Sequence, residues 1–260
     1  MTGSSLVEDA LRRDRLPVVV GLALVVGVSS GYLLAGAGMM HDMGGALMPM
    51  SSGPWTPAHA FVVVVMWVAM MAAMMLPSAA PMVLFHAAIT RQRSKGIAPA
   101  DVSSGAFVLG YLAVWSAFSV AATALQYSLE RLALLSPMMQ TTNVFLAGAV
   151  LVGAGVYQWT PLKRACLRQC QTPLAFVMAH WRDGIAGAFA MGARHGAACL
   201  GCCWPLMLLL FVGGVMNVGW IAGVAVFVAI EKLAPTCSWI SRAAGALLVA
   251  WGVATWLAAA

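Results

Sequence analysis

Charged residues are scarce in this chain. Of its 260 residues, 8% are Asp, Glu, Lys or Arg, whereas 62% are hydrophobic. Soluble globular domains carry about 25% charged residues, so the composition excludes that class. The sequence also lacks the G-x-x-x-x-G-K pattern of a phosphate-binding loop, so it offers no such motif to couple movement of a substrate to nucleotide hydrolysis.

Long stretches of alternating apolar and polar residues are absent as well, which excludes a membrane β-barrel. The apolar runs are continuous, and several approach the roughly 20 residues that cross a bilayer core of about 30 Å. We therefore predict an all-α, polytopic helix bundle that forms one integral membrane domain over residues 1–260. The first run is longer than the apolar region of a signal peptide, and we expect it to be retained. The predicted spans are 17–38, 59–86, 105–127, 142–160, 197–216, 218–231 and 240–258.

Basic residues mark one side of this bundle. Lys and Arg collect in cytoplasmic loops near span ends, and with seven spans every basic residue except Arg131 falls on the same side. Residues 1–16 are then cytoplasmic, the C-terminus is outside, and a bacterial inner membrane is the expected location. The basic residues flank separate spans and form no single patch, which argues against nucleic-acid binding. The groups are Arg12, Arg13 and Arg15; Arg91, Arg93 and Lys95; Lys163, Arg164 and Arg168; and Lys232 and Arg242.

The segment 161–196 is expected to form a cysteine-containing region at the cytoplasmic interface. Its later part, 174–196, holds Arg182, Asp183 and Arg194. An additional crossing there would place Lys232 and Arg242 outside, against the charge pattern. We therefore predict that 174–196 is an interfacial or partly re-entrant helix.

Metal-binding side chains cluster at the start of the fifth predicted span. On a helix, His195, Cys199, Cys202 and Cys203 share one stripe, and such thiolates and imidazoles bind soft metals. The alternative is that these cysteines only pack as small apolar residues. Cys166 and Cys170 lie one helical turn apart, so they could bind one ion linearly or pair with the other cysteines.

Two methionine-rich segments accompany the cysteines. The predicted outer loop, 39–57, holds Met39, His41 and Met43 and contains no Lys, Arg or Cys, although it could also be a connector without a metal role. In the second span, Met71 and Met75 share a helical face before Pro77 and Pro81, which should kink the helix and free carbonyls along an ion path. Methionine also packs well in cores, which is the alternative.

The two sides of the membrane thus carry different sulfur ligands. Thioethers resist oxidation to disulfides outside, whereas all six cysteines lie on or near the reducing cytoplasmic side. Both sulfur types suit copper(I), so copper(I) is the favoured metal; zinc remains open for a set of three cysteines and one histidine.

Three sequence blocks resemble a bacterial family of predicted metal-binding integral membrane proteins, some of whose members are labelled copper chaperones. The resemblance covers roughly residues 60–235 and implies a membrane metal site. The blocks are Met70-Met71-Ala-Ala-Met74-Met75-Leu-Pro77, Tyr157-Gln158-x-x-Pro161-Leu-Lys163-x-x-Cys166-x-x-x-Cys170, and Gly196-x-x-Cys199-x-Gly201-Cys202-Cys203-Trp204 with Glu231-Lys232 downstream.

These patterns favour a protein that acquires or transfers copper(I) between the outer loop and the cytoplasmic cysteines, with a cuproenzyme or a soluble copper carrier as partner. One alternative is a membrane metalloenzyme or thiol oxidoreductase that uses Cys199-x-x-Cys202, with Glu231 or Asp183 handling protons. Another is an assembly factor that delivers metal to a membrane cuproenzyme. Glu231 could also be a counter-ion to Arg194 or Arg242. The sequence leaves open whether the chain is an enzyme.

Overall fold

A computed structural model describes residues 3–35, 40–42, 47–49, 55–93, 100–136, 139–234 and 238–259. Apart from two short strands, the elements are helices, as the sequence predicts. The helices are α1 (Gly3–Leu34), α2 (Pro57–Arg93), α3 (Ala100–Arg131), α4 (Val144–Tyr157), α5 (Pro161–Gln171), α6 (Pro173–His180), α7 (Gly184–Leu208), α8 (Leu210–Gly213), α9 (Val218–Leu233) and α10 (Ser238–Leu257).

The membrane-spanning part contains fewer long helices than predicted. Five described helices are long and apolar enough to cross a membrane, and α4 with α5, bent by 65°, would make a sixth. The sixth predicted span, 218–231, corresponds to α9, whose 16 residues extend only about 24 Å at 1.5 Å per residue. The five long spans are Leu16–Leu34, Pro57–Gln92, Asp101–Arg131, Gly184–Gly213 and Trp239–Leu257.

The segment 174–196, which was predicted to be an interfacial or partly re-entrant helix, is divided between two helices. Gly184–Leu208 forms one continuous helix, α7, so residues 184–196 begin the span that was expected to start at residue 197. Because α7 continues past residue 196, residues 184–196 add no crossing of their own, which is compatible with the charge pattern downstream. Only the short helix α6 (Pro173–His180) remains separate.

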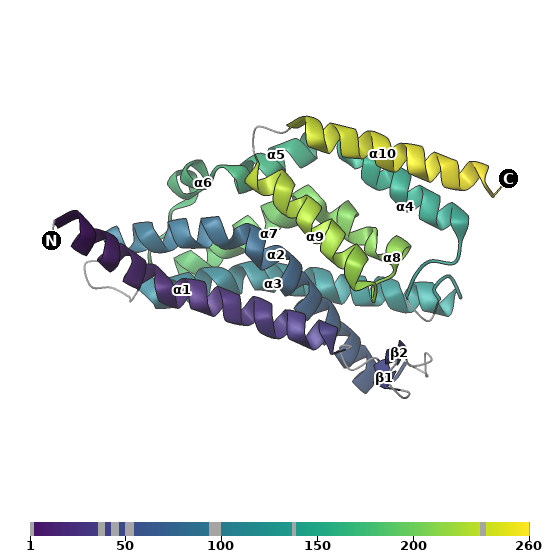
Figure 1. The fold of residues 1–260 in the computed structure, drawn as a ribbon, viewed down its shortest axis with the longest axis horizontal. Helices are drawn as coiled ribbons and strands as arrows, with labels where there is room; N and C mark the ends of the chain where they lie inside the picture. The colour runs from purple at the N-terminus through teal and green to yellow at the C-terminus, as the bar shows by residue number, and fades with distance from the viewer. Residues whose placement is uncertain are drawn as a thin grey trace.

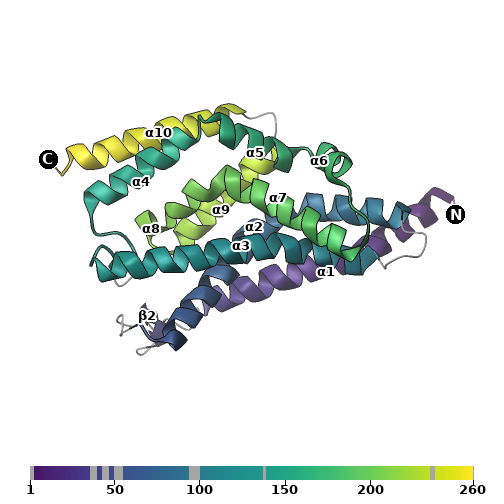
Figure 2. The same ribbon diagram turned by 180° about the vertical axis from the view of Figure 1, so that it is seen from behind.

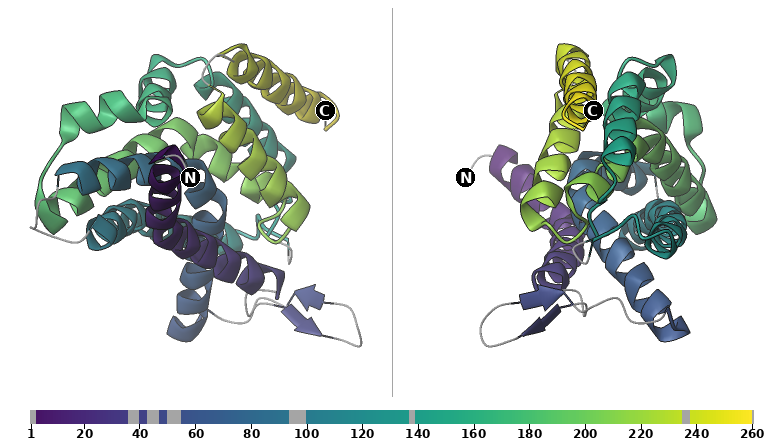
Figure 3. Two further views of the ribbon diagram at one scale, coloured as in Figure 1. Left: turned by 60° about the vertical axis from the view of Figure 1, so that its left-hand side comes forward. Right: turned by 90° about the vertical axis from the view of Figure 1, so that its right-hand side faces the viewer.

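The bundle has two parts that meet around α7 and α9. In Figure 1, α1, α2, α3 and α7 lie alongside one another, and α4 runs beside α10 on the opposite side. Figure 2 shows α7 beside α3 from behind, with α5 leading into α6. The views in Figure 3 place α9 between these two parts. The N-terminus and the C-terminus lie at opposite ends of the molecule (Figure 1).

Glycines let α3 and α7 approach each other closely. A Cβ atom on Gly192 would lie 1.9 Å from the carbonyl oxygen of Phe107, and one on Gly110 would lie 2.1 Å from that of Phe189. Small residues at helix contacts are the usual means of close packing in membranes. This contact fixes the α7 residues that follow Gly192 against α3.

The second helix is bent (Figures 1 and 3), as expected with Pro77 and Pro81 inside it. The Met75 carbonyl accepts hydrogen bonds from Ser78 Oγ at 2.9 Å and from the Tyr111 hydroxyl at 3.2 Å. The second bond ties α3 to α2 next to the methionine-rich face.

A short hairpin precedes α2. Strands β1 (Met40–Asp42) and β2 (Leu47–Pro49) are antiparallel, with His41 opposite Met48. These strands were not predicted from the sequence, although a pair such as Gly44-Gly45 is typical of hairpin turns. Met39 and Met43 lie outside the described residues, and for His41 the structure describes only the backbone.

Candidate metal centre

The cysteines of α7 face the interior of the bundle. Cys199, Cys202 and Cys203 are 1%, 2% and 1% exposed and belong to the same apolar cluster as Met75 and Tyr111. Their positions on one helical stripe put all three on the side of α7 that the other helices cover.

The Cys199 thiol contacts polar groups from two other helices. Lys232 Nζ, from the last turn of α9, lies 2.9 Å from Cys199 Sγ, and the Tyr111 hydroxyl of α3 lies 3.0 Å from it. The same ammonium lies 3.2 Å from Ser78 Oγ and 3.7 Å from Met75 Sδ. Helices α2, α3, α7 and α9 therefore meet at this sulfur.

Lys232 is a buried cation without a carboxylate partner in the described part of the chain. It is 5% exposed, and the ion pairs among the described residues join Arg91 to Asp101 and Lys163 to Glu231. A buried ammonium is costly unless an anion lies close to it. The contact with Cys199 therefore favours the thiolate form of this cysteine.

A cysteine of α5 completes a group of four neighbouring thiols, which we call the thiol cluster: Cys170, Cys199, Cys202 and Cys203. Cys170 is half-buried and packs against the apolar cluster that contains the other three. Both Cys202 and Cys203 also donate hydrogen bonds of 3.0 Å to the Cys199 carbonyl, as thiols on helices commonly do.

Cys166 lies at the edge of this cluster. A Cβ atom on Gly201 would be 2.7 Å from Cys166 Sγ, so the glycine lets α5 approach α7. The five described cysteines form no disulfide, and Cys237 lies outside the described residues.

His195 adds an unpaired nitrogen one helical turn before Cys199. Its ring is 2% exposed and stacks on Tyr111 at 5.7 Å between centroids, with Phe176 edge-on at 5.4 Å. The Nδ1 atom has no hydrogen-bond partner, an uncommon condition for a buried polar atom. It is therefore free to bind a ligand.

The described residues hold no group of three or more His, Cys, Asp or Glu side chains arranged around a metal position. The thiol cluster thus offers neighbouring pairs of sulfurs and no ready cage of three or four ligands. A pair of thiolates suffices for copper(I), which accepts two soft ligands in a line.

The predicted methionines differ in their relation to this centre. Met71 and Met75 are both fully buried, and Met75 reaches Lys232 beside Cys199. Met71 lies in the same apolar cluster, one turn nearer the hairpin. From Pro57 to Met75, α2 extends roughly 27 Å at 1.5 Å per residue, which separates the hairpin that contains His41 from the thiol cluster.

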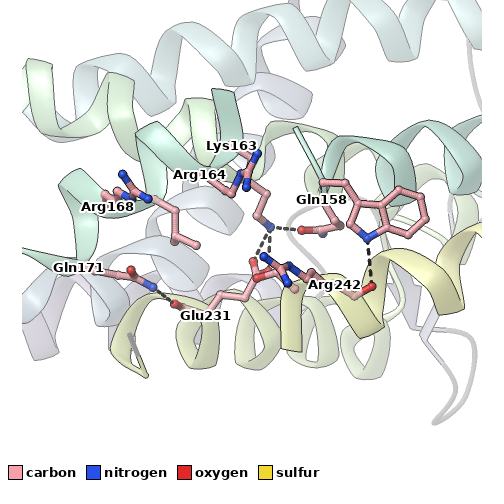
Figure 4. Close-up of a pocket in the computed structure, with 10 residues that line it drawn as sticks. Gln158, Lys163, Arg164, Arg168, Gln171, Glu231 and Arg242 are labelled. Carbon is pink, nitrogen blue, oxygen red and sulfur yellow. Dashed lines mark hydrogen bonds and ion pairs between the residues drawn. The ribbon is translucent and has the colours of Figure 1, made fainter. Parts of the chain in front are cut away.

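A buried ion pair lies next to the thiol cluster. Lys163 Nζ lies 2.7 Å from Glu231 Oε2, with side chains 0% and 2% exposed, and also contacts Gln158 (Figure 4). Lys163, and neither Arg194 nor Arg242, is therefore the counter-ion of Glu231. Because Glu231 and Lys232 are consecutive, the end of α9 directs one charge to α5 and the other to the thiol cluster.

Three polar residues of these centres were not predicted from the sequence. Lys163 and Lys232 were used for topology and stood in the blocks that resemble the family, but neither was given a role at a site, and Tyr111 received no role. A lysine adjoining Glu231 at a span end was a usable signal, because intramembrane charges are usually paired or functional. Nothing in the spacing of α3 marks Tyr111.

Comparison with known proteins supports this picture of a copper-handling membrane protein. The PpoB2 family, described as copper chaperone, matches residues 64–255, which include α7, the described cysteines and Lys232. No curated protein and no solved structure matches the chain. Because the match covers most of the sequence, the chain belongs to the PpoB2 copper chaperone family.

Proposed function

We propose that the protein carries copper(I) as cargo and holds it between two thiolates of α5 and α7, Cys199 and either Cys170 or Cys202. The observation that carries this proposal is the ammonium of Lys232 at 2.9 Å from Cys199 Sγ. Two thiolates and one copper(I) ion have a net charge of −1. Lys232 brings the sum to zero, which a low-dielectric interior favours.

The other neighbours fit the same cargo. With Cys199 as a thiolate, Tyr111 can turn its single hydroxyl proton from the Met75 carbonyl to this sulfur. The unpaired Nδ1 of His195 lies one helical turn before Cys199. Cys203, which belongs to the same buried cluster as Cys199 and Cys202, can exchange with either of them. A set of alternative sulfur pairs suits a chaperone, because the ion can move from one pair to the next without being released.

The route of copper(I) is the next part of the proposal. Met39, His41 and Met43 capture the ion on the outer side, and Met71 and Met75 pass it along α2 to the thiol cluster. Cys166 and Cys170, next to basic residues that mark the cytoplasmic side, exchange it with a soluble carrier or a cuproenzyme. In this topology α9 is a short sixth crossing, α10 is the seventh, and the N-terminus is in the cytoplasm of a bacterial inner-membrane protein.

Copper(I) binding to the purified protein tests this proposal. The assay is competition with a chromophoric copper(I) chelator under anaerobic, reducing conditions. The wild type should bind copper(I) tightly, and C199S should lose most of that affinity. C237S is the matched control, because Cys237 has no assigned role. Equal binding by the wild type and by a C199S/C202S/C203S variant would reject the proposal.

Thiol oxidoreductase activity is the second candidate. A thiolate stabilised by a cation is also what a reactive cysteine requires, and Cys199 and Cys202 have the spacing of a dithiol pair. Mass spectrometry of thiols alkylated before and after mild oxidation separates the two functions. A reversible Cys199–Cys202 disulfide in a protein isolated without copper would favour the oxidoreductase.

An assembly factor for a membrane cuproenzyme would use the same copper(I) site. It differs from a free-standing carrier in its partner, so co-purification with a cuproenzyme subunit distinguishes the two.

A further inference from the structure

A basic pocket of about 360 Å³ lies between α5, α9 and α10 (Figure 4). Its lining includes Trp159 at the end of α4, Arg164 and Arg168 of α5, and Arg242 in the first turns of α10. The copper(I) centre does not account for this pocket, because the cysteines of α5 do not line it.

The pocket has an uncompensated positive charge. At its floor, the buried Lys163 and Glu231 neutralise each other at 2.7 Å. Arg164, Arg168 and Arg242 are exposed, and within the described ranges none of them forms an ion pair. Three guanidinium groups around one pocket repel one another, so an anion that binds between them would be stabilised by all three.

The kind of anion follows from the position of the pocket. Lys and Arg at span ends mark the cytoplasmic surface of the membrane, where lipid phosphates lie. Trp159, which lines the pocket, is 44% exposed, and Leu162 and Trp239, close in the chain to lining residues, are 59% and 66% exposed. Tryptophan prefers the headgroup level, so these residues place the pocket next to lipid.

We propose that this pocket binds the phosphate of an anionic phospholipid headgroup from the inner leaflet. Guanidinium groups bind phosphate through paired, charge-assisted hydrogen bonds, and basic pockets between helices on the cytoplasmic side suit such headgroups. The indole of Trp159 donates a hydrogen bond of 3.2 Å to the Arg242 carbonyl, which fixes α10 against the end of α4. This site does not depend on the proposed copper function.

The lipid site shares two structural elements with the thiol cluster. Gln171 lines the pocket and donates a 2.7 Å hydrogen bond to the carbonyl of Glu231, so the ends of α5 and α9 are joined there. Cys170 and Lys232 are the neighbouring residues in the chain, and both belong to the metal centre. A headgroup that bridges α5 and α10 would therefore hold the scaffold of the cysteines in place.

The test compares lipid binding of the wild type with that of an R164Q/R168Q/R242Q variant. The matched control is R12Q/R13Q/R15Q, which removes the same number of charges from the same side. Each protein is purified in a zwitterionic detergent and titrated with phosphatidylglycerol, phosphatidylcholine or inorganic phosphate. Bound lipid is counted by native mass spectrometry, and the thermal unfolding midpoint is recorded in parallel.

For the wild type and the control, we expect phosphatidylglycerol to bind and to raise the unfolding midpoint, and phosphatidylcholine to do neither. The pocket variant should bind phosphatidylglycerol about tenfold more weakly or worse, because charge-assisted hydrogen bonds are lost. Equal lipid binding by the pocket variant and the control would overturn the proposal. So would stabilisation by inorganic phosphate alone, which would indicate a free anion as the ligand. Copper(I) stoichiometry, measured on the same samples, reports on the other site separately.

Discussion

The ammonium of Lys232 lies 2.9 Å from the sulfur of Cys199, so the end of α9 contacts the middle of α7 through a cation and a thiol. Neither group has a carboxylate neighbour among the described ion pairs. This relationship makes the charge state of one residue depend on the other, and it yields the first prediction.

Replacing Lys232 with methionine should weaken copper(I) binding by about tenfold or more, because an uncompensated buried charge costs at least about 1.4 kcal/mol. Protons compete with copper(I) for the thiols, so the affinity of K232M should fall more steeply than that of the wild type as the pH is lowered. Competition titrations with a copper(I) chelator across a pH series measure both effects. K232R, which keeps the charge, should retain most of the affinity, and equal affinities for K232M and the wild type would contradict the role of this cation.

The Lys163–Glu231 pair should stabilise the fold and contribute little to copper(I) binding directly. E231Q leaves the fully buried Lys163 ammonium without its anion and should destabilise the protein by about 3–5 kcal/mol. The measurement is equilibrium unfolding in detergent. The double variant K163M/E231Q removes both charges and should recover much of the lost stability. If E231Q is as stable as the wild type, the ion pair does not have this role.

The helical membrane architecture was predictable because apolar runs report directly on burial in lipid. Local spacing also placed Cys199, Cys202 and Cys203 on one helical face. The length of α7 was not predictable in this way, because Asp183 and Arg194 suggested an interface where the helix continues.

Contacts between distant helices could not be derived from spacing either. Lys232 and Cys199 are 33 positions apart, and Tyr111 and Cys199 are 88 apart. Such pairs depend on which helices pack together, and no periodic pattern encodes that choice. The pairing of Cys170 with the α7 cysteines was one of the alternatives that the sequence left open, and in the structure Cys170 packs against the apolar cluster that contains them.

The close contact between α3 and α7 should be necessary for the metal centre. In G192A, the new Cβ would lie 1.9 Å from the Phe107 carbonyl oxygen, so the helices must separate. Overpacking of this kind costs about 1–3 kcal/mol, and the separation should also move Tyr111 away from Cys199. G223A is the control, because a Cβ there meets no atom within 4 Å. Thermal unfolding and copper(I) affinity should both fall for G192A only; if G192A behaves like G223A, the contact is not required.

The methionine path along α2 makes a kinetic prediction. M75L keeps the buried volume next to Lys232 but removes the thioether, so copper(I) should reach the thiol cluster more slowly while the final occupancy stays the same. M66L is the matched control, because Met66 is equally buried in α2 but lies on a neighbouring ridge of the helix. The assay follows copper(I) transfer from an external donor into protein reconstituted in vesicles, with a rapid-quench measurement of bound metal. Slower transfer in M75L than in M66L supports the path. Equal rates would mean that Met75 only packs, and that copper(I) reaches Cys199 by a route that does not use this thioether.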